Sequence, residues 1–206
     1  MAKPPAHSTY ARYVGEIAIS WNKIEREVNN LIYYFMGGEA DVAGFILGSM
    51  GNQTKADFLS FLVQRSKRSQ QVKDGVIYAV QLFNRIRENR NIVEHGVPLR
   101  DPSGSYGGQL VKLDKSSNFR TFSAPIELVK EVAEAARRTE GWLRAVMTAL
   151  TIDEDPENHE PSPHGKSLAE ASQIWLSSLG RPPLPRKIGP LELEEAPKGG
   201  RRQPSP

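Results

Sequence analysis

The chain contains no cysteine among its 206 residues. Without thiols it can have no disulfide framework, no thiolate nucleophile and no cysteine-ligated zinc site, so these classes of chemistry are excluded. Long apolar runs are also absent. No stretch approaches the roughly 18 consecutive apolar residues of a membrane span, and the N-terminal sequence lacks the apolar segment of a signal peptide. We therefore expect a cytoplasmic protein with no membrane contact.

Apolar side chains are scarce overall. Hydrophobic residues make up 38% of the chain, there are 15 prolines, and the mean hydropathy is −0.48, which indicates that part of the sequence does not pack into a core. After Asp153 the composition shifts to Pro, Glu, Ser and Gly. We expect a flexible N-terminus over 1–8, one folded domain over 9–150 and a mostly disordered tail over 151–206.

The folded part carries a mild excess of positive charge. Residues 1–150 hold 20 Lys and Arg against 15 Asp and Glu, whereas the whole chain has a net charge of +3. An excess of this size favours a polyanionic partner only slightly.

Helical spacing of apolar residues dominates the first 150 positions. Between Gly96 and Ser123 the pattern changes: Pro98 and Pro102 are typical of loops, and two short alternating stretches predict a β-hairpin inserted at about 101–122. The predicted fold is all-α, an up-and-down helical bundle with a small β-hairpin insertion and a disordered Pro-rich C-terminal tail. The expected helices span 9–36, 39–49, 54–68, 72–95 and 125–150, and the expected strands span 109–114 and 119–123.

The tail offers two weaker patterns. Residues 168–179 have the spacing of a short helix that would dock on the bundle or on another chain, and the run from Arg181 to Lys187 would present a polyproline II surface to a partner protein or serve as a solvated linker. His159 and His164 lie five residues apart with nothing to preorganise them, so we expect no metal site and no cofactor.

The end of the 72–95 helix carries the main polar cluster. Arg87, Asn91 and His95 are spaced by four and share one helical face, and Asn84 extends this row. We expect Arg87 and Asn84 to bind a substrate.

Arg90 falls beside the apolar stripe of the same helix. A guanidinium is costly there unless it is paired or faces a cleft or interface. Glu25 borders the corresponding stripe of the first helix, between Ile24 and Val28. The pattern predicts a buried structural pair between Glu25 and Arg90.

The run Arg90-Asn91-Ile92-Val93-Glu94-His95 resembles the motif of HEPN domains (higher eukaryotes and prokaryotes nucleotide-binding). That motif has an Arg, a polar residue, a short spacer and a His, late in a long helix of an all-α bundle. The resemblance covers this motif and the bundle layout of residues 9–150. It implies a homodimeric, metal-independent endoribonuclease of the toxin or phage-defence kind, with RNA as substrate and an antitoxin or other protein as a partner of the tail.

The resemblance also implies roles for three residues. His95 would act as general acid or base toward a ribose 2′-OH or a leaving 5′ oxygen. Arg90 would stabilise the charge that develops on the phosphate, and Asn91 would orient the phosphate or His95.

A structural explanation of the same residues stays open. A His before a Gly at a helix C-terminus interacts favourably with the helix dipole, and Arg90–Glu94 is an ordinary i,i+4 pair. The alternative function is therefore a non-catalytic helical dimerisation or interaction module with a structural Arg-His cluster, and nucleotide binding without cleavage would use the same residues. Exposure of Arg90 and His95 favours chemistry, whereas burial of Arg90 against Glu25 favours structure.

Overall fold

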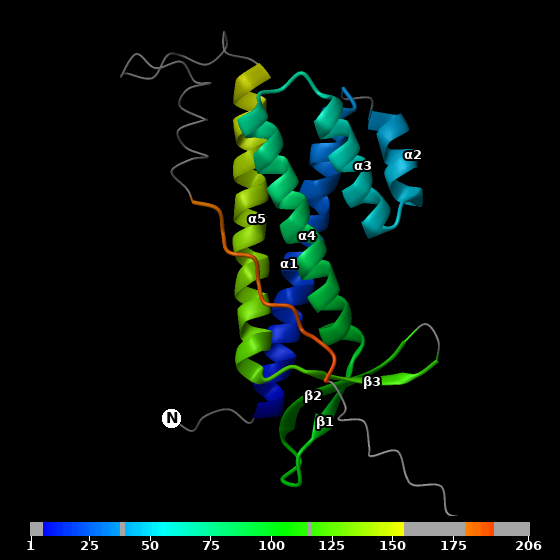
Figure 1. Ribbon diagram of the computed structural model, residues 1–206, viewed down its shortest axis with the longest axis vertical. Coiled ribbons are helices and arrows are strands. Elements are labelled where there is room, and N and C mark those ends of the chain that lie inside the picture. The colour runs from blue at the N-terminus through cyan, green and yellow to red at the C-terminus, as the bar shows by residue number, and fades with distance from the viewer. Residues whose placement is uncertain (1–5, 38–39, 115–116, 155–179, 192–206) are drawn as a thin grey trace, which may run out of the picture.

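A computed structural model describes residues 6–37, 40–114, 117–154 and 180–191 (Figure 1). None of its helices, within these residues, is long and apolar enough to cross a membrane. In chain order the elements are α1 (Ala6–Phe35), α2 (Ala40–Ser49), α3 (Asn52–Arg65), α4 (Gln70–His95), β1 (Val97–Arg100), β2 (Tyr106–Leu113), β3 (Phe119–Ser123) and α5 (Ile126–Glu154).

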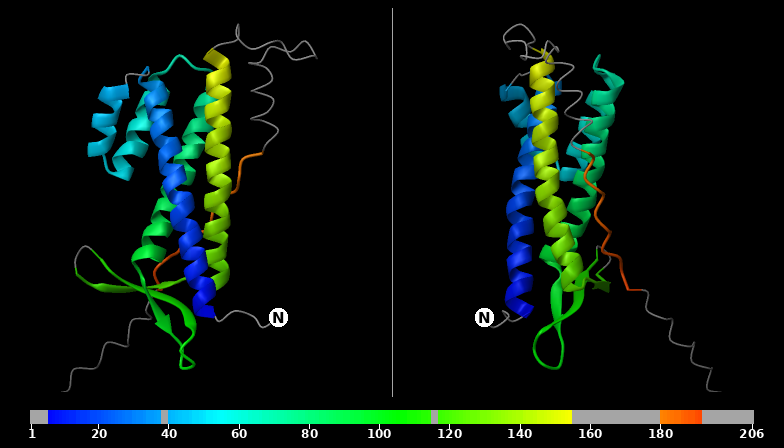
Figure 2. Two further views of the ribbon diagram at one scale, coloured as in Figure 1. Left: turned by 180° about the vertical axis from the view of Figure 1, so that it is seen from behind. Right: turned by 90° about the vertical axis from the view of Figure 1, so that its left-hand side faces the viewer.

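The three long helices α1, α4 and α5 run side by side, and the shorter α3 covers only one end of the group (Figures 1 and 2). Their apolar stripes meet in a core in which the Trp21 ring stacks on the Phe83 ring at 4.9 Å between centroids. The predicted mainly helical fold is confirmed. The helix α2 lies outside the group beside α3, and Phe45 on it is 83% exposed.

The β-structure is a three-stranded antiparallel sheet of order β1-β2-β3, so the prediction of a hairpin alone was wrong. The strands β2 and β3 form the expected hairpin, but Val97–Arg100, predicted as loop because of Pro98, pairs with β2. Pro98 lies opposite Leu110 in an edge strand, where a missing N–H interrupts little of the ladder. Leu110 is fully buried against the lower end of the bundle.

Residues 180–191 form an extended segment, here called the strap, that crosses α4 and α5 and reaches the sheet (Figure 1). Ile188 is fully buried, and Pro190 forms a β-bridge with Phe122. The expectation of a disordered tail therefore does not hold for these residues, because side chains of the bundle bind the strap backbone. The predicted 168–179 helix, His159 and His164 lie outside the described residues, as does most of the predicted flexible N-terminus.

Candidate functional site at the C-terminal end of helix α4

The motif lies on the part of α4 that α3 does not cover. The Arg87 guanidinium hydrogen-bonds to the Gln53 side chain in the first turn of α3. Beyond this contact α4 continues past α3 for about two turns and ends next to the sheet (Figure 1). The sequence motif therefore lies at the end of the bundle that has only the three long helices.

Arg90 has two polar partners on α4 and one aromatic neighbour on α1. Its Nη2 lies 2.6 Å from Glu94 Oε2, its Nη1 donates to Asn91 Oδ1 at 3.2 Å, and its guanidinium lies 5.8 Å from the centroid of the Trp21 ring. The Arg90 side chain is 25% exposed and that of Glu94 is 13% exposed. The guanidinium is thus paired and partly shielded, yet still reachable from solvent.

The Glu25–Arg90 pair predicted from the sequence is not the arrangement that the structure shows. Glu25 Oε1 instead accepts from Lys55 Nζ at 3.0 Å, and the Lys55 side chain is 8% exposed. Helix α3 packs against α1 and supplies this nearer cation, while Glu94 lies one turn from Arg90 on α4. Helical spacing identified the right faces but not which neighbouring helix each face meets.

Several polar atoms of this stripe of α4 are buried and have no hydrogen-bond partner. They are Asn84 Oδ1, Arg87 Nε, Arg90 Nε and Glu94 Oε1. A buried polar atom without a partner costs about 1–3 kcal/mol, and native proteins retain few of them. This row of α4 therefore contains two buried donors and two buried acceptors without a partner among the described residues.

His95 is the last residue of α4, and its side chain is exposed. Gly96 follows because the helix end and the sheet approach closely: a Cβ there would lie 2.5 Å from the Ile92 carbonyl oxygen and 3.0 Å from Leu110 Cβ. The Gly96 N–H caps the helix by donating to the same Ile92 oxygen at 2.8 Å. The close junction fixes His95 where helix and sheet meet.

Asn91 connects the motif to the sheet. Its side chain accepts from Arg90, and its backbone carbonyl accepts from Lys112 Nζ at 2.9 Å. Lys112 lies on β2, 21 positions further along the chain. Sequence reasoning did not identify Lys112, because only the strand register decides which hairpin residues face the helix.

A pocket of about 370 Å³ opens beside Asn91, between α4, the β2–β3 hairpin and the strap. Two ion pairs border it: Arg120 Nε lies 2.9 Å from Asp114 Oδ2, and Lys187 Nζ lies 2.9 Å from Glu88 Oε2. The pocket is lined by Glu88, Asn91, Ile92, Lys112, Leu113, Asp114, Arg120, Phe122 and Lys187.

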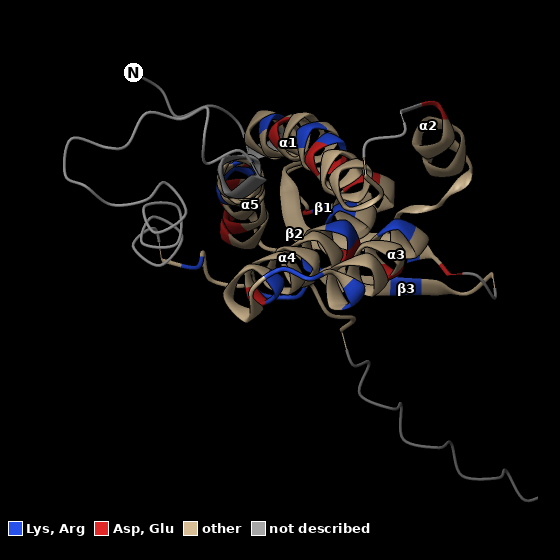
Figure 3. Cartoon of the chain, turned by 90° about the horizontal axis from the view of Figure 1, so that it is seen from above, with Lys and Arg blue, Asp and Glu red and all other residues tan. Residues whose placement is uncertain are grey.

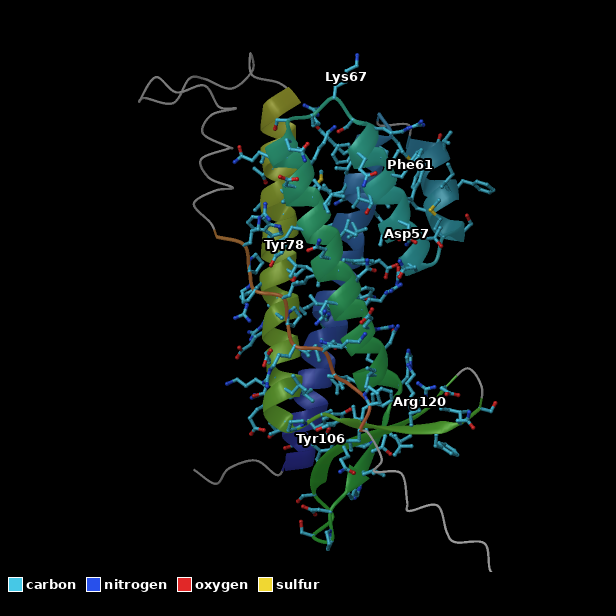
Figure 4. All side chains as sticks on the ribbon, in the orientation of Figure 1. Asp57, Phe61, Lys67, Tyr78, Tyr106 and Arg120 are labelled. Carbon is cyan, nitrogen blue, oxygen red and sulfur yellow. The ribbon has the colours of Figure 1, made fainter. Side chains whose placement is uncertain are left out.

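The strap that closes one side of this pocket is bound by side chains of α4 (Figure 4). The Tyr78 hydroxyl donates to the Pro182 carbonyl at 2.5 Å, and Arg85 Nη1 donates to the Pro185 carbonyl at 3.1 Å. These contacts satisfy the backbone carbonyls of Pro182 and Pro185. Because proline has no N–H, these two residues could not also donate to a neighbouring strand.

Asn89 makes the innermost contact with the strap. It is fully buried, its Nδ2 donates to the Arg186 carbonyl at 2.8 Å, and its Oδ1 accepts from the Ile188 N–H at 3.0 Å. The available sequence signal was an amide on the buried stripe of a helix, seven residues after Leu82 and three after Ile86. Such an amide requires a polar partner, and the strap is that partner.

An ion pair anchors the strap to α5. The Arg186 side chain donates to Glu131 through Nε at 2.8 Å and Nη2 at 2.5 Å, and its backbone N–H adds a third bond at 3.2 Å. The side-chain hydrogen bonds from Arg186 lower the pKa of the Glu131 carboxyl below its ordinary value.

The described residues contain no group of three or more His, Asp or Glu side chains able to hold a metal ion. Comparison of the chain with protein-family models, with curated proteins and with solved structures finds no match.

Proposed function

We propose that this protein is a homodimeric, metal-independent endoribonuclease, of the toxin or phage-defence kind, whose active centre lies at the C-terminal end of α4. The observation that carries the proposal is the presence of a solvent-reachable Arg90 and an exposed His95 on the last two turns of α4, beyond the cover of α3. The likeness of the Arg90–His95 run to the HEPN motif supports it. Arg87 and Asn84, earlier on the same helix, would contact the substrate.

The reaction would be an intramolecular transesterification of RNA. The ribose 2′ oxygen attacks the adjacent phosphorus, the bond from phosphorus to the 5′ oxygen breaks, and the products carry a 2′,3′-cyclic phosphate and a 5′ hydroxyl. One imidazole takes the 2′ proton and another gives a proton to the leaving oxygen. One protomer would bring its His95 to this site, and the His95 of a second copy would supply the other imidazole.

Arg90 would stabilise the phosphate as charge builds on it. Glu94 and Asn91 each use one contact on its two terminal nitrogens, and each of these nitrogens keeps a second N–H for a phosphate oxygen. A bound phosphate would compete with the Glu94 carboxylate for the guanidinium. Asn91, already bonded to Arg90, would keep the guanidinium oriented during this competition.

The outer face of the sheet supports self-association. Val97 is 65% exposed, Leu113 50% and Phe119 78%. Strand pairing places Val97, Val111 and Thr121 in one row and Leu113 with Phe119 in the next, so the described strand residues on this face are uncharged. An uncharged apolar face can meet its own copy without like-charge repulsion. His95 precedes Val97 by two residues, so a dimer formed through this face would bring the two His95 side chains toward the same seam.

The test is the chemistry of the cut ends. Purified protein is incubated with a mixed RNA in excess EDTA, and the product termini are analysed. The proposal predicts 2′,3′-cyclic phosphate and 5′-hydroxyl ends. Cleavage that needs added divalent cations, or that leaves 5′-phosphate ends, would contradict it.

The second candidate function is a non-catalytic dimerisation or interaction module. The observation that favours it is that both terminal nitrogens of Arg90 already have partners on α4, as expected of a structural charge. In this case the sheet face would bind a second copy, and an antitoxin or other partner that used the strap would have to replace the contacts made by Tyr78, Arg85 and Asn89. Such a protein would form the dimer but cut no RNA.

A further inference from the structure

The pocket beside Asn91 combines apolar walls with a cationic rim. Ile92, Leu113 and Phe122 supply apolar surface, and its volume of about 370 Å³ lies in the range of small-ligand sites. The cations come from three separate parts of the chain: Lys112 from β2, Arg120 from β3 and Lys187 from the strap. Figure 3 shows basic positions on the strap, α4 and β3 on the same side of the molecule.

The charges of the rim do not cancel. Arg120 is paired with Asp114 and Lys187 with Glu88, and both cations are more than half exposed. Lys112 has no ion pair among the described residues; its ammonium donates to the Asn91 carbonyl. An ammonium has three N–H donors, so two remain for a ligand. The pocket thus has one excess positive charge. Its source is the Lys112 ammonium, which is held in place by its hydrogen bond to Asn91.

We propose that this pocket binds one nucleotide unit of a single-stranded RNA, with Lys112 on a phosphate and the base against Phe122 and Ile92. Arg120 and Lys187 add charge at the rim, where each can exchange its carboxylate partner for a phosphate oxygen. The inference rests on the proposed function in one respect: the RNA held here is the strand that is cut at Arg90 and His95. Asn91 contacts both places and fixes their separation.

The strap is part of this site, because it contributes Lys187 and closes one wall. Asn89 binds the two neighbours of Lys187, which are Arg186 and Ile188. Glu131 binds Arg186 as well. The ligand therefore meets a lysine whose backbone is fixed before binding, which lowers the entropic cost of ordering it.

The experiment measures binding separately from cleavage. A short fluorescent single-stranded RNA with 2′-O-methyl riboses has no nucleophile and cannot be cut, so its affinity is measured directly by anisotropy. The proteins compared are wild type, Lys112→Gln, Lys112→Arg and Lys130→Gln. Lys130 is the matched control, because it is an exposed lysine on α5 that pairs with Glu134 and lies outside the pocket. Circular dichroism is recorded first, to check that all four proteins are equally helical.

We expect Lys112→Gln to weaken binding about tenfold and to lower the slope of affinity against salt by about one phosphate contact, while Lys112→Arg and Lys130→Gln bind like wild type. Uridine 5′-monophosphate should compete with the oligonucleotide better than inorganic phosphate does; equal competition would overturn the base contact. Equal affinity of Lys112→Gln and Lys130→Gln would overturn the assignment, as would absence of binding by wild type.

Cleavage of unmodified RNA by the same four proteins separates this inference from the proposed function. Binding that depends on Lys112 without any cleavage would refute the endoribonuclease and leave the nucleotide pocket standing. Cleavage by wild type, together with an RNA affinity that is the same in Lys112→Gln, would refute the nucleotide pocket and leave the endoribonuclease proposal intact.

Discussion

The buried side-chain amide of Asn89 bonds to the backbone N–H of Ile188 and, through its other atom, to the carbonyl of Arg186. A single side chain thereby pairs with an extended segment as a neighbouring strand would. Asn89 and Ile188 are 99 positions apart, so this contact joins two distant parts of the chain. Together with the contacts of Tyr78, Arg85 and Glu131, it holds the strap on the bundle.

We predict that Asn89→Ala releases the strap. The substitution leaves the Arg186 carbonyl and the Ile188 N–H without partners in a buried place, which we expect to cost about 2–3 kcal/mol of unfolding free energy. Urea denaturation measures the loss, and trypsin should cut faster after Arg186 and Lys187. The control Asn22→Ala, at an exposed position of α1, should change neither. Unchanged trypsin protection in Asn89→Ala would show that other contacts hold the strap.

The Glu131–Arg186 pair predicts a dependence of stability on pH. The folded protein lowers the pKa of Glu131, so the stabilisation is complete above the ordinary pKa of a glutamate and is lost as the pH falls below it. Arg186 stays charged throughout this range. Because Glu131 is partly exposed, we expect an effect of no more than about 1 kcal/mol. Denaturation midpoints of wild type and Glu131→Gln should converge as the pH is lowered from 6 toward 3; a constant difference would contradict the assignment.

Glu94 is expected to restrain Arg90 before the substrate binds. Glu94→Gln removes the charge that competes with the phosphate but keeps a side chain of similar shape, so the affinity for RNA should rise several-fold. The measured quantity is the affinity for an uncleavable RNA. Glu134→Gln on α5 is the control, because Glu134 also forms an i,i+4 pair with a cation. Weaker RNA binding by Glu94→Gln would mean that the carboxylate is needed to position Arg90.

The sheet face is expected to hold two copies together. Phe119→Glu puts a charge at the turn end of the β2–β3 hairpin, on this uncharged face, and should convert dimers to monomers, as measured by light scattering after size exclusion. Phe45→Glu is the matched control, because Phe45 is even more exposed but lies on α2. A wild-type protein that is monomeric at high concentration, or a Phe119→Glu variant that stays dimeric, would rule out this interface.

The sequence predicted the parts of the fold that depend on local spacing. The long helices follow from their apolar stripes, and the β2–β3 hairpin follows from its alternation. The third strand was missed because Pro98 is typical of a loop, and an edge strand tolerates it only because a neighbour is present. The strap was missed because its binding uses backbone carbonyls, which every sequence has, and only Ile188 and Pro185 supply buried apolar surface.

Of the candidate site, the sequence predicted the residues that are neighbours in the chain but not those brought in by tertiary contacts. Arg90, Asn91 and His95 are adjacent in the chain, so their common location at the end of α4 could be expected from the sequence. The pairing of Arg90 with Glu94 is the i,i+4 contact that the structural explanation named from spacing alone. The partner of Glu25 could not be predicted, because helical spacing says which face a residue occupies and not which helix lies opposite. Lys112 and Lys187 reach the site only through the tertiary arrangement of the sheet and the strap.

The most direct test of the proposed function is the rate of RNA cleavage in EDTA by wild type and His95→Ala, with His164→Ala as a control for the loss of a histidine. Circular dichroism and light scattering establish first that the three proteins have equal helicity and the same oligomeric state. If His95 is the acid or base, cleavage falls by about 100-fold or more in His95→Ala and is unchanged in His164→Ala. Equal cleavage by wild type and His95→Ala would contradict the account, and so would a wild type that cuts no RNA.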